Sequence, residues 1–164
     1  MKKSLVILAV LALGFVFTQS VFAGDQTVNM SVSSIALLDV PAGPITLNIT
    51  TGTPGVDALT AVSAASTFSW VHNYTAGRKI TAQLKTALPA GYLLTVTTTP
   101  HATKGTGVTD QSLVDAAAHD VVTALPKGFD LNGGISYTFG ANASADELSA
   151  AEAGNTVTYT IVAP

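Results

Sequence analysis

A strictly alternating stretch, Lys79-Ile80-Thr81-Ala82-Gln83-Leu84-Lys85, decides the fold class of this 164-residue chain. Its apolar residues stand at every second position, and polar residues fill the positions between them. Successive side chains of a β-strand point to opposite faces, so the pattern predicts a strand with one face in a core and one in solvent. Threonine suits the outer face, because its branched side chain fits a pleated surface and its hydroxyl stays solvated.

The same alternation recurs along most of the chain. Turn-forming Pro, Gly and Asn residues separate the alternating runs, and no long helical pattern lies between them. Two short connections predict an antiparallel meander over 67–99. We therefore expect an all-β fold, an immunoglobulin-like antiparallel β-sandwich of about 7–9 strands. The further predicted strands are 27–32, 45–50, 68–74, 92–98, 135–139 and 157–163.

A helix is expected near the C-terminus. Ser144 and Glu147 have the spacing of a capping box, and acidic residues in a first helical turn are favoured by the helix dipole. Gly154 is a typical helix stop. The sequence predicts one short surface helix over 145–153.

The stretch 109–125 allows two interpretations. Leu113, Ala117 and Val121 would share one face of a helix, whereas the β-branched end of the stretch is typical of a strand. We favour a strand at 120–125 after an irregular, alanine-rich stretch.

The first residues have the composition of a secretory signal peptide. Two lysines precede an apolar run over 5–17, and residues tolerated at a cleavage site follow it. This run is shorter than the roughly 18–20 residues that span a bilayer. We predict a signal peptide at 1–23 and one β-sandwich domain at 24–164, exported to the periplasm, the cell surface or the extracellular medium, with no membrane span after cleavage.

The chain carries few charges and no cysteine. Its 7 basic and 10 acidic residues give a formal net charge of −3, and loss of Lys2 and Lys3 with the signal peptide takes that charge to −5. Because no basic cluster exists, we expect no nucleic-acid partner. The lack of cysteine excludes disulfides, thiolate metal sites and thiol catalysis.

Aromatic side chains concentrate in the predicted strand 68–74. Side chains two residues apart share a face, which groups Phe68, Trp70, His72 and Tyr74. In one interpretation Trp70, His72 and Tyr74 form a platform for sugar rings, with glycans as partners. In the other, Trp70, the only tryptophan, is the central core residue. We favour the core and keep carbohydrate binding as the alternative.

No set of polar residues predicts catalysis. His72, His101 and His119 lack the close spacing of a ligand pair, so we expect no metal site and no cofactor. A metal-dependent hydrolase built on His101, His119 and nearby acids is the weakest alternative. The acidic residues fall mainly in loops, and neither a Gly-x-Ser-x-Gly elbow nor a phosphate-binding loop occurs. The run 130–134, Asp-Leu-Asn-Gly-Gly, lacks the closing acid of a calcium loop, so a hairpin turn is expected there.

Three segments, 78–84, 87–91 and 154–161, resemble a group of secreted bacterial β-sandwich proteins of uncharacterised function. The sequence pattern of these segments is also similar to that of fimbrial subunits and adhesin-type domains. This resemblance implies a structural or surface role without catalytic residues. We expect an exported, non-enzymatic protein, a fimbria-like or extracellular matrix subunit, whose partners are other protein chains joined by strand addition. The runs 27–32 and 156–163 are the candidate strands.

Overall fold

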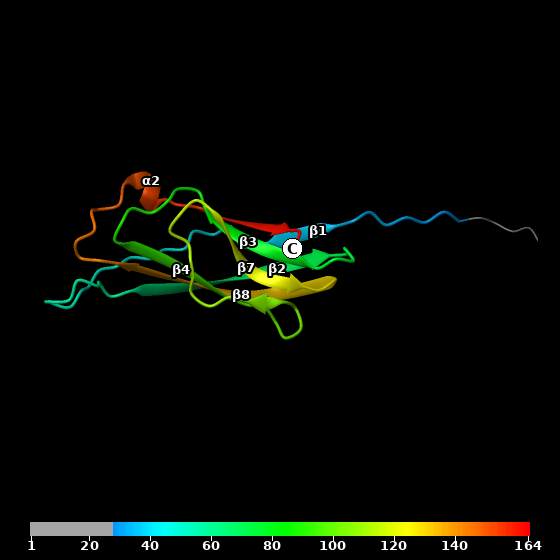
Figure 1. Ribbon diagram of the computed structural model, residues 1–164, viewed down its shortest axis with the longest axis horizontal. Coiled ribbons are helices and arrows are strands. Elements are labelled where there is room, and N and C mark those ends of the chain that lie inside the picture. The colour runs from blue at the N-terminus through cyan, green and yellow to red at the C-terminus, as the bar shows by residue number, and fades with distance from the viewer. Residues whose placement is uncertain (1–27) are drawn as a thin grey trace, which may run out of the picture. The chain divides into compact units, whose positions relative to one another are not determined.

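A computed structural model describes residues 28–164 and shows two antiparallel β-sheets packed face to face, which confirms the predicted all-β sandwich (Figure 1). The described residues contain nine strands: β1 Ala36–Asp39, β2 Val62–His72, β3 Arg78–Leu84, β4 Tyr92–Thr99, β5 Thr106–Gly107, β6 Gln111–Ser112, β7 Ala118–Leu125, β8 Gly128–Ala141 and β9 Val157–Val162. The large sheet has the order β1-β2-β8-β4-β6, and the small sheet has the order β5-β7-β3-β9. The immunoglobulin-like topology stays a prediction.

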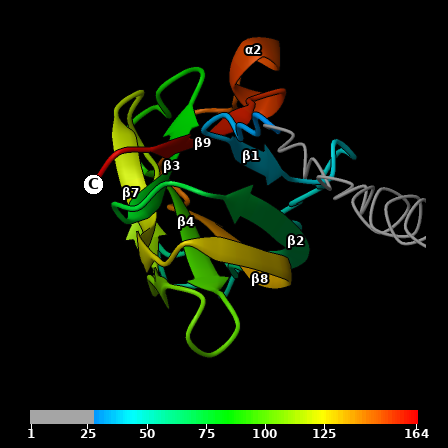
Figure 2. The same ribbon diagram turned by 90° about the vertical axis from the view of Figure 1, so that its right-hand side faces the viewer.

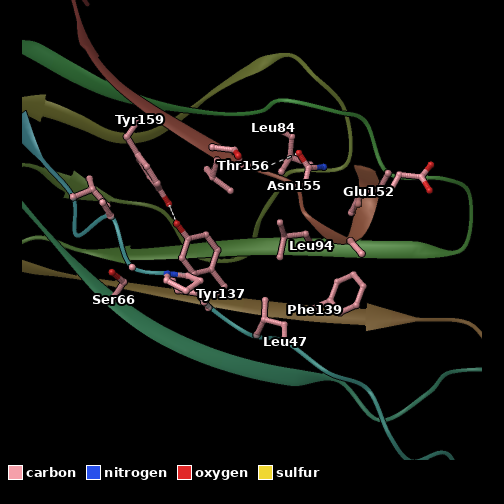
Figure 3. Close-up of a pocket in the computed structure, with 18 of the residues that line it drawn as sticks. Leu47, Ser66, Leu84, Leu94, Tyr137, Phe139, Glu152, Asn155, Thr156 and Tyr159 are labelled. Atoms are coloured by element: carbon pink, nitrogen blue, oxygen red, sulfur yellow. Dashed lines mark hydrogen bonds between the residues drawn. The ribbon is translucent and has the colours of Figure 1, made fainter. Parts of the chain in front are cut away.

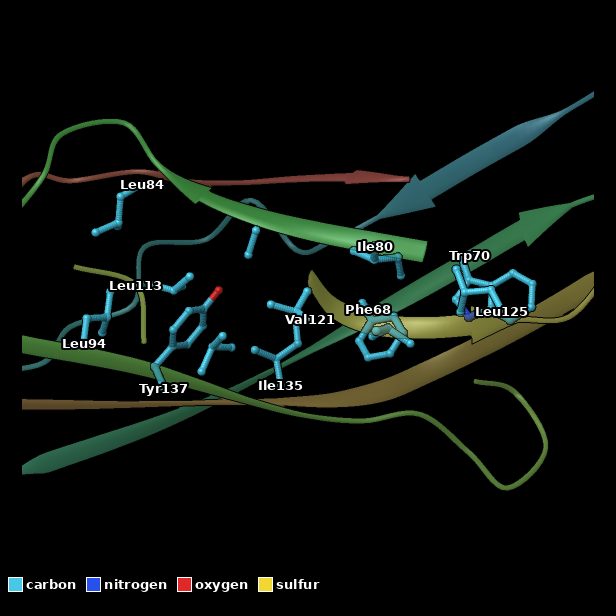
Figure 4. Packing of buried hydrophobic residues seen from close by; sticks show 13 residues of the cluster. Phe68, Trp70, Ile80, Leu84, Leu94, Leu113, Val121, Leu125, Ile135 and Tyr137 are labelled. Carbon is cyan, nitrogen blue, oxygen red and sulfur yellow. The ribbon is translucent and has the colours of Figure 1, made fainter. Parts of the chain in front are cut away.

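The stretch that decided the fold class forms β3. Its inward residues Ile80, Ala82 and Leu84 are each no more than 1% exposed. They pack in the interface between the sheets with residues such as Phe68 and Leu125 (Figure 4). Alternation therefore predicted correctly which face of this strand enters the core.

The predicted meander over 67–99 is wrong, because consecutive strands lie in different sheets. β2 pairs with β8, and β3 pairs with β7 and β9. Figure 2 shows β2 and β8 in one layer and β3 and β7 in the other. Stacked sheets lie about 10 Å apart, and the connections 73–77 and 85–91 are long enough to cross that gap. Short connections were therefore a poor guide to strand pairing.

The predicted strand at 45–50 does not form. The segment keeps its alternation, since Leu47 and Ile49 are half-buried while Asn48 and Thr50 are exposed, yet no strand pairs with it. β1 ends just before Pro41, and Pro44 follows, so two residues without a backbone N–H separate the segment from the sheet. Alternation without a partner leaves extended, irregular chain.

The start of the described chain also departs from its prediction. Residues 28–32, the described part of the predicted strand 27–32, form no strand. Val28, Met30 and Val32 are 65%, 88% and 84% exposed. We call residues 28–32 the N-terminal run. The predicted signal peptide 1–23 lies outside the described residues, and no helix of the described part is long and apolar enough to cross a membrane.

The strands β7 and β8 test two predictions for the second half of the chain. The predicted strand at 120–125 lies within β7, so the helical interpretation of 109–125 is wrong. The hairpin turn expected at 130–134 is also wrong, because these residues continue through β8. Asn132 does adopt a left-handed φ of 59°, which the sheet absorbs at a bulge opposite Phe68 and Trp70.

The helix is shorter than predicted. It covers only Ala150–Ala153 (α2), and its capping box is formed by Ser149 and Glu152 instead of Ser144 and Glu147. Both pairs have the same spacing, so the sequence signal did not distinguish them. Gly154 ends the helix as expected.

Candidate functional site

Two of the three residues proposed as a sugar platform are buried. Trp70 is 3% exposed and His72 is 1% exposed, and their rings stack with centroids 5.3 Å apart. Tyr74 lies beyond the end of β2, half-buried, with the Arg78 guanidinium 3.6 Å from its ring centroid. Burial of Trp70 removes the exposed surface that the carbohydrate interpretation requires and confirms the core interpretation.

The histidines are scattered, and two of them, His101 and His119, have separate carboxylate partners. His101 Nδ1 lies 2.8 Å from Oδ1 of Asp130, whose buried carboxylate also accepts the backbone N–H of His101. His119 Nε2 lies 2.8 Å from Oδ1 of Asp115, and this hydrogen bond lowers the pKa of the Asp115 carboxyl. His72 is in the core. Among residues 28–164, no three metal-ligating side chains come together.

An open cavity of about 580 Å³ lies between the sheets on the side of the sandwich bounded by β9 (Figure 3). The inward faces of the strands form its floor, and a proline-containing stretch, residues 40–48, forms one wall. We call this stretch the proline segment and the space the edge cavity. Residues from β2, β4, β8 and β9 that line it include Ser66, Leu94, Tyr137, Phe139, Val157 and Tyr159.

Two sequence features create the edge cavity. The first half of β2 places small side chains on its inner face, since Ala64 pairs with the buried Tyr137 and Ser66 pairs with the buried Ile135. Directly paired residues share a face of the sheet. In addition, β1 pairs only with the last residues of β2, 69–72, so the described chain leaves the outer edge of 62–68 without a neighbouring strand.

A pair of tyrosines crosses the edge cavity. The hydroxyl oxygens of Tyr137 on β8 and Tyr159 on β9 lie 2.5 Å apart (Figure 3). Burial raises the pKa of Tyr137, and burial together with the neighbouring Tyr137 raises the pKa of Tyr159. Both phenols are therefore neutral near pH 7, and their hydrogen bond joins the two sheets.

A second apolar feature lies on the outer face of the large sheet. Leu37, Val71 and Phe129 are directly paired across β1, β2 and β8, and they are 62%, 41% and 62% exposed. Elsewhere the outward positions of this sheet carry mainly Thr and Ser, such as Thr97 and Ser136. The row reaches β1, which is an edge strand.

Two long edges lack a hydrogen-bonded partner strand in the described part of the chain, although β1 lies close to β9. β9 pairs only with β3, and the 62–68 half of β2 pairs only with β8. Neither edge carries a charged residue. Charged side chains on edge strands are a common protection against pairing with other chains.

Comparison with known proteins does not assign the chain to a family. The chain matches no protein-family model, and no curated protein is similar to it.

Sequence reasoning missed the edge cavity. Its signals were present in the small residues Ala64 and Ser66 and in the prolines Pro41 and Pro44. These signals acquire meaning only when β2 is known to pair with β8 and β9 is known to lie opposite.

Proposed function

We propose that the protein is an exported, non-enzymatic structural or surface protein that joins other protein chains by adding strands to its sheet edges. The observation that carries this proposal is the pair of unpaired, uncharged edges formed by β9 and by residues 62–68 of β2. An edge strand presents main-chain N–H and C=O groups that a further strand can bind. The partner contributes main-chain N–H and C=O groups, so the contact requires few specific side chains.

The N-terminal run supports the same function. Val28, Met30 and Val32 alternate with polar residues, as in a half-buried strand, yet all three are mostly exposed. Exposed apolar side chains at every second position are the feature expected of a strand that lacks a partner sheet. The outward row of Leu37, Val71 and Phe129 adds apolar surface beside an edge strand.

The distribution of polar groups favours a non-enzymatic role. The described Asp and His residues that lie close together, Asp130 with His101 and Asp115 with His119, are isolated pairs that hold loops and strand ends. Neither pair lines the edge cavity.

The proposal is tested with the chain that begins at Gly24 and with a version that begins at Ser33. The shorter chain keeps Ser33, whose carbonyl accepts a hydrogen bond from Asn73. Size-exclusion chromatography with light scattering and electron microscopy should show concentration-dependent oligomers or fibres of the longer chain and monomers of the shorter one. Matching circular dichroism spectra would show that both are folded. A longer chain that stays monomeric up to millimolar concentration would refute assembly of this protein with itself.

A further inference from the structure

We infer that the outer face of the large sheet binds a second copy of this chain, with the two faces packed against each other in a two-fold dimer. The contact surface consists of four exposed apolar side chains, which we call the outer patch: Leu37, Val71, Phe129 and Leu131. The proposed function uses main-chain groups at sheet edges, whereas this contact uses side chains on a sheet face. The inference therefore goes beyond the proposed function.

Strand pairing brings the outer patch together. Val71 on β2 pairs with Leu37 on β1 and with Phe129 on β8, so the three side chains form a row across the sheet. Leu131 follows two residues after Phe129 on β8 and is exposed on the same face. All four residues line a shallow hollow of about 300 Å³. A contiguous apolar surface of this kind on a folded domain marks an interaction site.

Opposite charges flank the outer patch. On the β1 side, Asp39 is exposed two residues after Leu37 and on the same face. On the β8 side, the Lys104 ammonium lies 4.8 Å from the centre of the Phe129 ring. Within residues 28–164, neither Asp39 nor Lys104 has an ion-pair partner. Each side of the patch therefore presents a charge that the other side of a second copy can neutralise.

These charges select one orientation of the two copies. With a two-fold axis parallel to the strands at Val71, β1 of each copy faces β8 of the other, and Asp39 approaches Lys104 of the second copy. With an axis across the strands, β1 would face β1, and the two Asp39 carboxylates would repel each other. We therefore assign the first orientation, in which Leu37 packs on Phe129 of the second copy. Such a contact is self-complementary and closes at two copies.

The size of the outer patch predicts a weak dimer. Its side chains are between 41% and 63% exposed, which leaves roughly 400 Å² of apolar surface on each copy. Two copies together bury roughly 800 Å² of apolar surface, to which the charged rim adds. Specific, stable complexes bury about 1,200–2,000 Å². We therefore expect a dimer that forms at high protein concentration and dissociates on dilution.

A charge at the centre of the outer patch tests the contact. Val71→Asp sets two carboxylates against each other at the two-fold axis, so the dissociation constant of the dimer should rise at least about tenfold. Sedimentation velocity of the chain that begins at Gly24, over a range of concentrations, measures this constant. Ser136→Asp is the matched control, because Ser136 lies on the same face of β8 outside the patch and its change should leave the constant unaltered. Circular dichroism verifies that both variants are folded. Equal weakening by the two variants would overturn the inference.

Charge reversal tests the orientation. Asp39→Lys and Lys104→Asp each place like charges at both rims of the dimer, so each variant alone should associate at least about threefold more weakly at low ionic strength. A mixture of the two variants restores opposite charges at both rims, and a mixed dimer should form about as well as the original one. Absence of any preference for the mixed dimer would refute the assigned orientation.

Two further results separate this contact from other uses of the patch. Strand addition at the edges gives species larger than a dimer, so Val71→Asp should remove the dimer and leave those species unchanged. Because the dimer dissociates on dilution, the chain that begins at Ser33 still elutes as a monomer in dilute size-exclusion chromatography and dimerises only at high concentration. A chain that stays monomeric up to millimolar concentration, yet cosediments with phosphatidylcholine vesicles through Val71, would assign the patch to a lipid surface and overturn the second copy as its partner.

Discussion

The tyrosine pair makes the stability of the sandwich sensitive to alkaline pH. An unfolded tyrosine ionises near the ordinary pKa of 10.0, whereas burial in the folded protein raises the pKa of both Tyr137 and Tyr159. Above pH 10 the unfolded chain therefore loses protons that the folded chain keeps. Proton release favours the unfolded state, so the contribution of the pair is complete below pH 10 and is lost as the pH rises.

The size of the effect follows from the linkage. A tyrosine that stays protonated in the folded state lowers the free energy of unfolding by at most about 1.4 kcal/mol per pH unit above its unfolded pKa. Two such groups give about 1–3 kcal/mol at pH 11, the lower figure allowing for solvent that reaches the edge cavity. The double variant Tyr137→Phe with Tyr159→Phe lacks this loss. At pH 7 it loses only the hydrogen bond, about 0.5–1.5 kcal/mol.

Urea denaturation between pH 7 and 11, followed by circular dichroism, measures the effect. The difference in unfolding free energy between the original chain and the double variant should shrink and then change sign as the pH passes 10. Absorbance at 295 nm gives a second readout, since two of the four tyrosines should ionise only when the protein unfolds. A difference in stability that is constant from pH 7 to 11 would refute the buried, neutral pair.

Two further predictions concern packing and the entry of the chain into the sandwich. Gly133→Ala would place a Cβ 2.6 Å from Cζ of Phe68, so thermal or urea unfolding should show a loss of about 1–3 kcal/mol, whereas Gly43→Ala, with nothing within 4 Å, should leave stability unchanged. Equal stability of both variants would contradict the close packing. Asn73→Ala removes two side-chain hydrogen bonds, and hydrogen exchange should speed up at the Ile35 amide with a loss of about 1–2 kcal/mol. Unchanged exchange at Ile35 would show that Asn73 does not hold this segment.

Period-two alternation predicted most of the long strands and their core faces, because side-chain direction in a strand depends only on neighbouring positions. Phe68 and Ile80 point into the core as their patterns indicate. The pairing of the strands was harder to predict from the sequence. Whether β2 pairs with β3 or with β8 depends on contacts between residues far apart in sequence, and the connection 73–77 is compatible with either choice.

The same limit applies to the candidate site. Trp70 was predicted correctly as a core residue, since one large side chain suits the centre of a sandwich. The edge cavity could not be predicted, because it results from a strand that fails to form at 45–50 and from small residues on a different strand, β2. An alternating pattern indicates which residues suit a strand, but it does not show whether a partner strand lies beside them.

The placement of consecutive strands in opposite sheets has a consequence for the time course of folding. The small sheet pairs Ile80 of β3 with Ile161 of β9, two residues that lie far apart in the sequence. Folds dominated by such distant pairings have high contact order and reach the native state in milliseconds to seconds, more slowly than helical proteins of similar size. The small sheet is therefore completed only after residues 157–162 have been synthesised, which makes its formation a late event in folding.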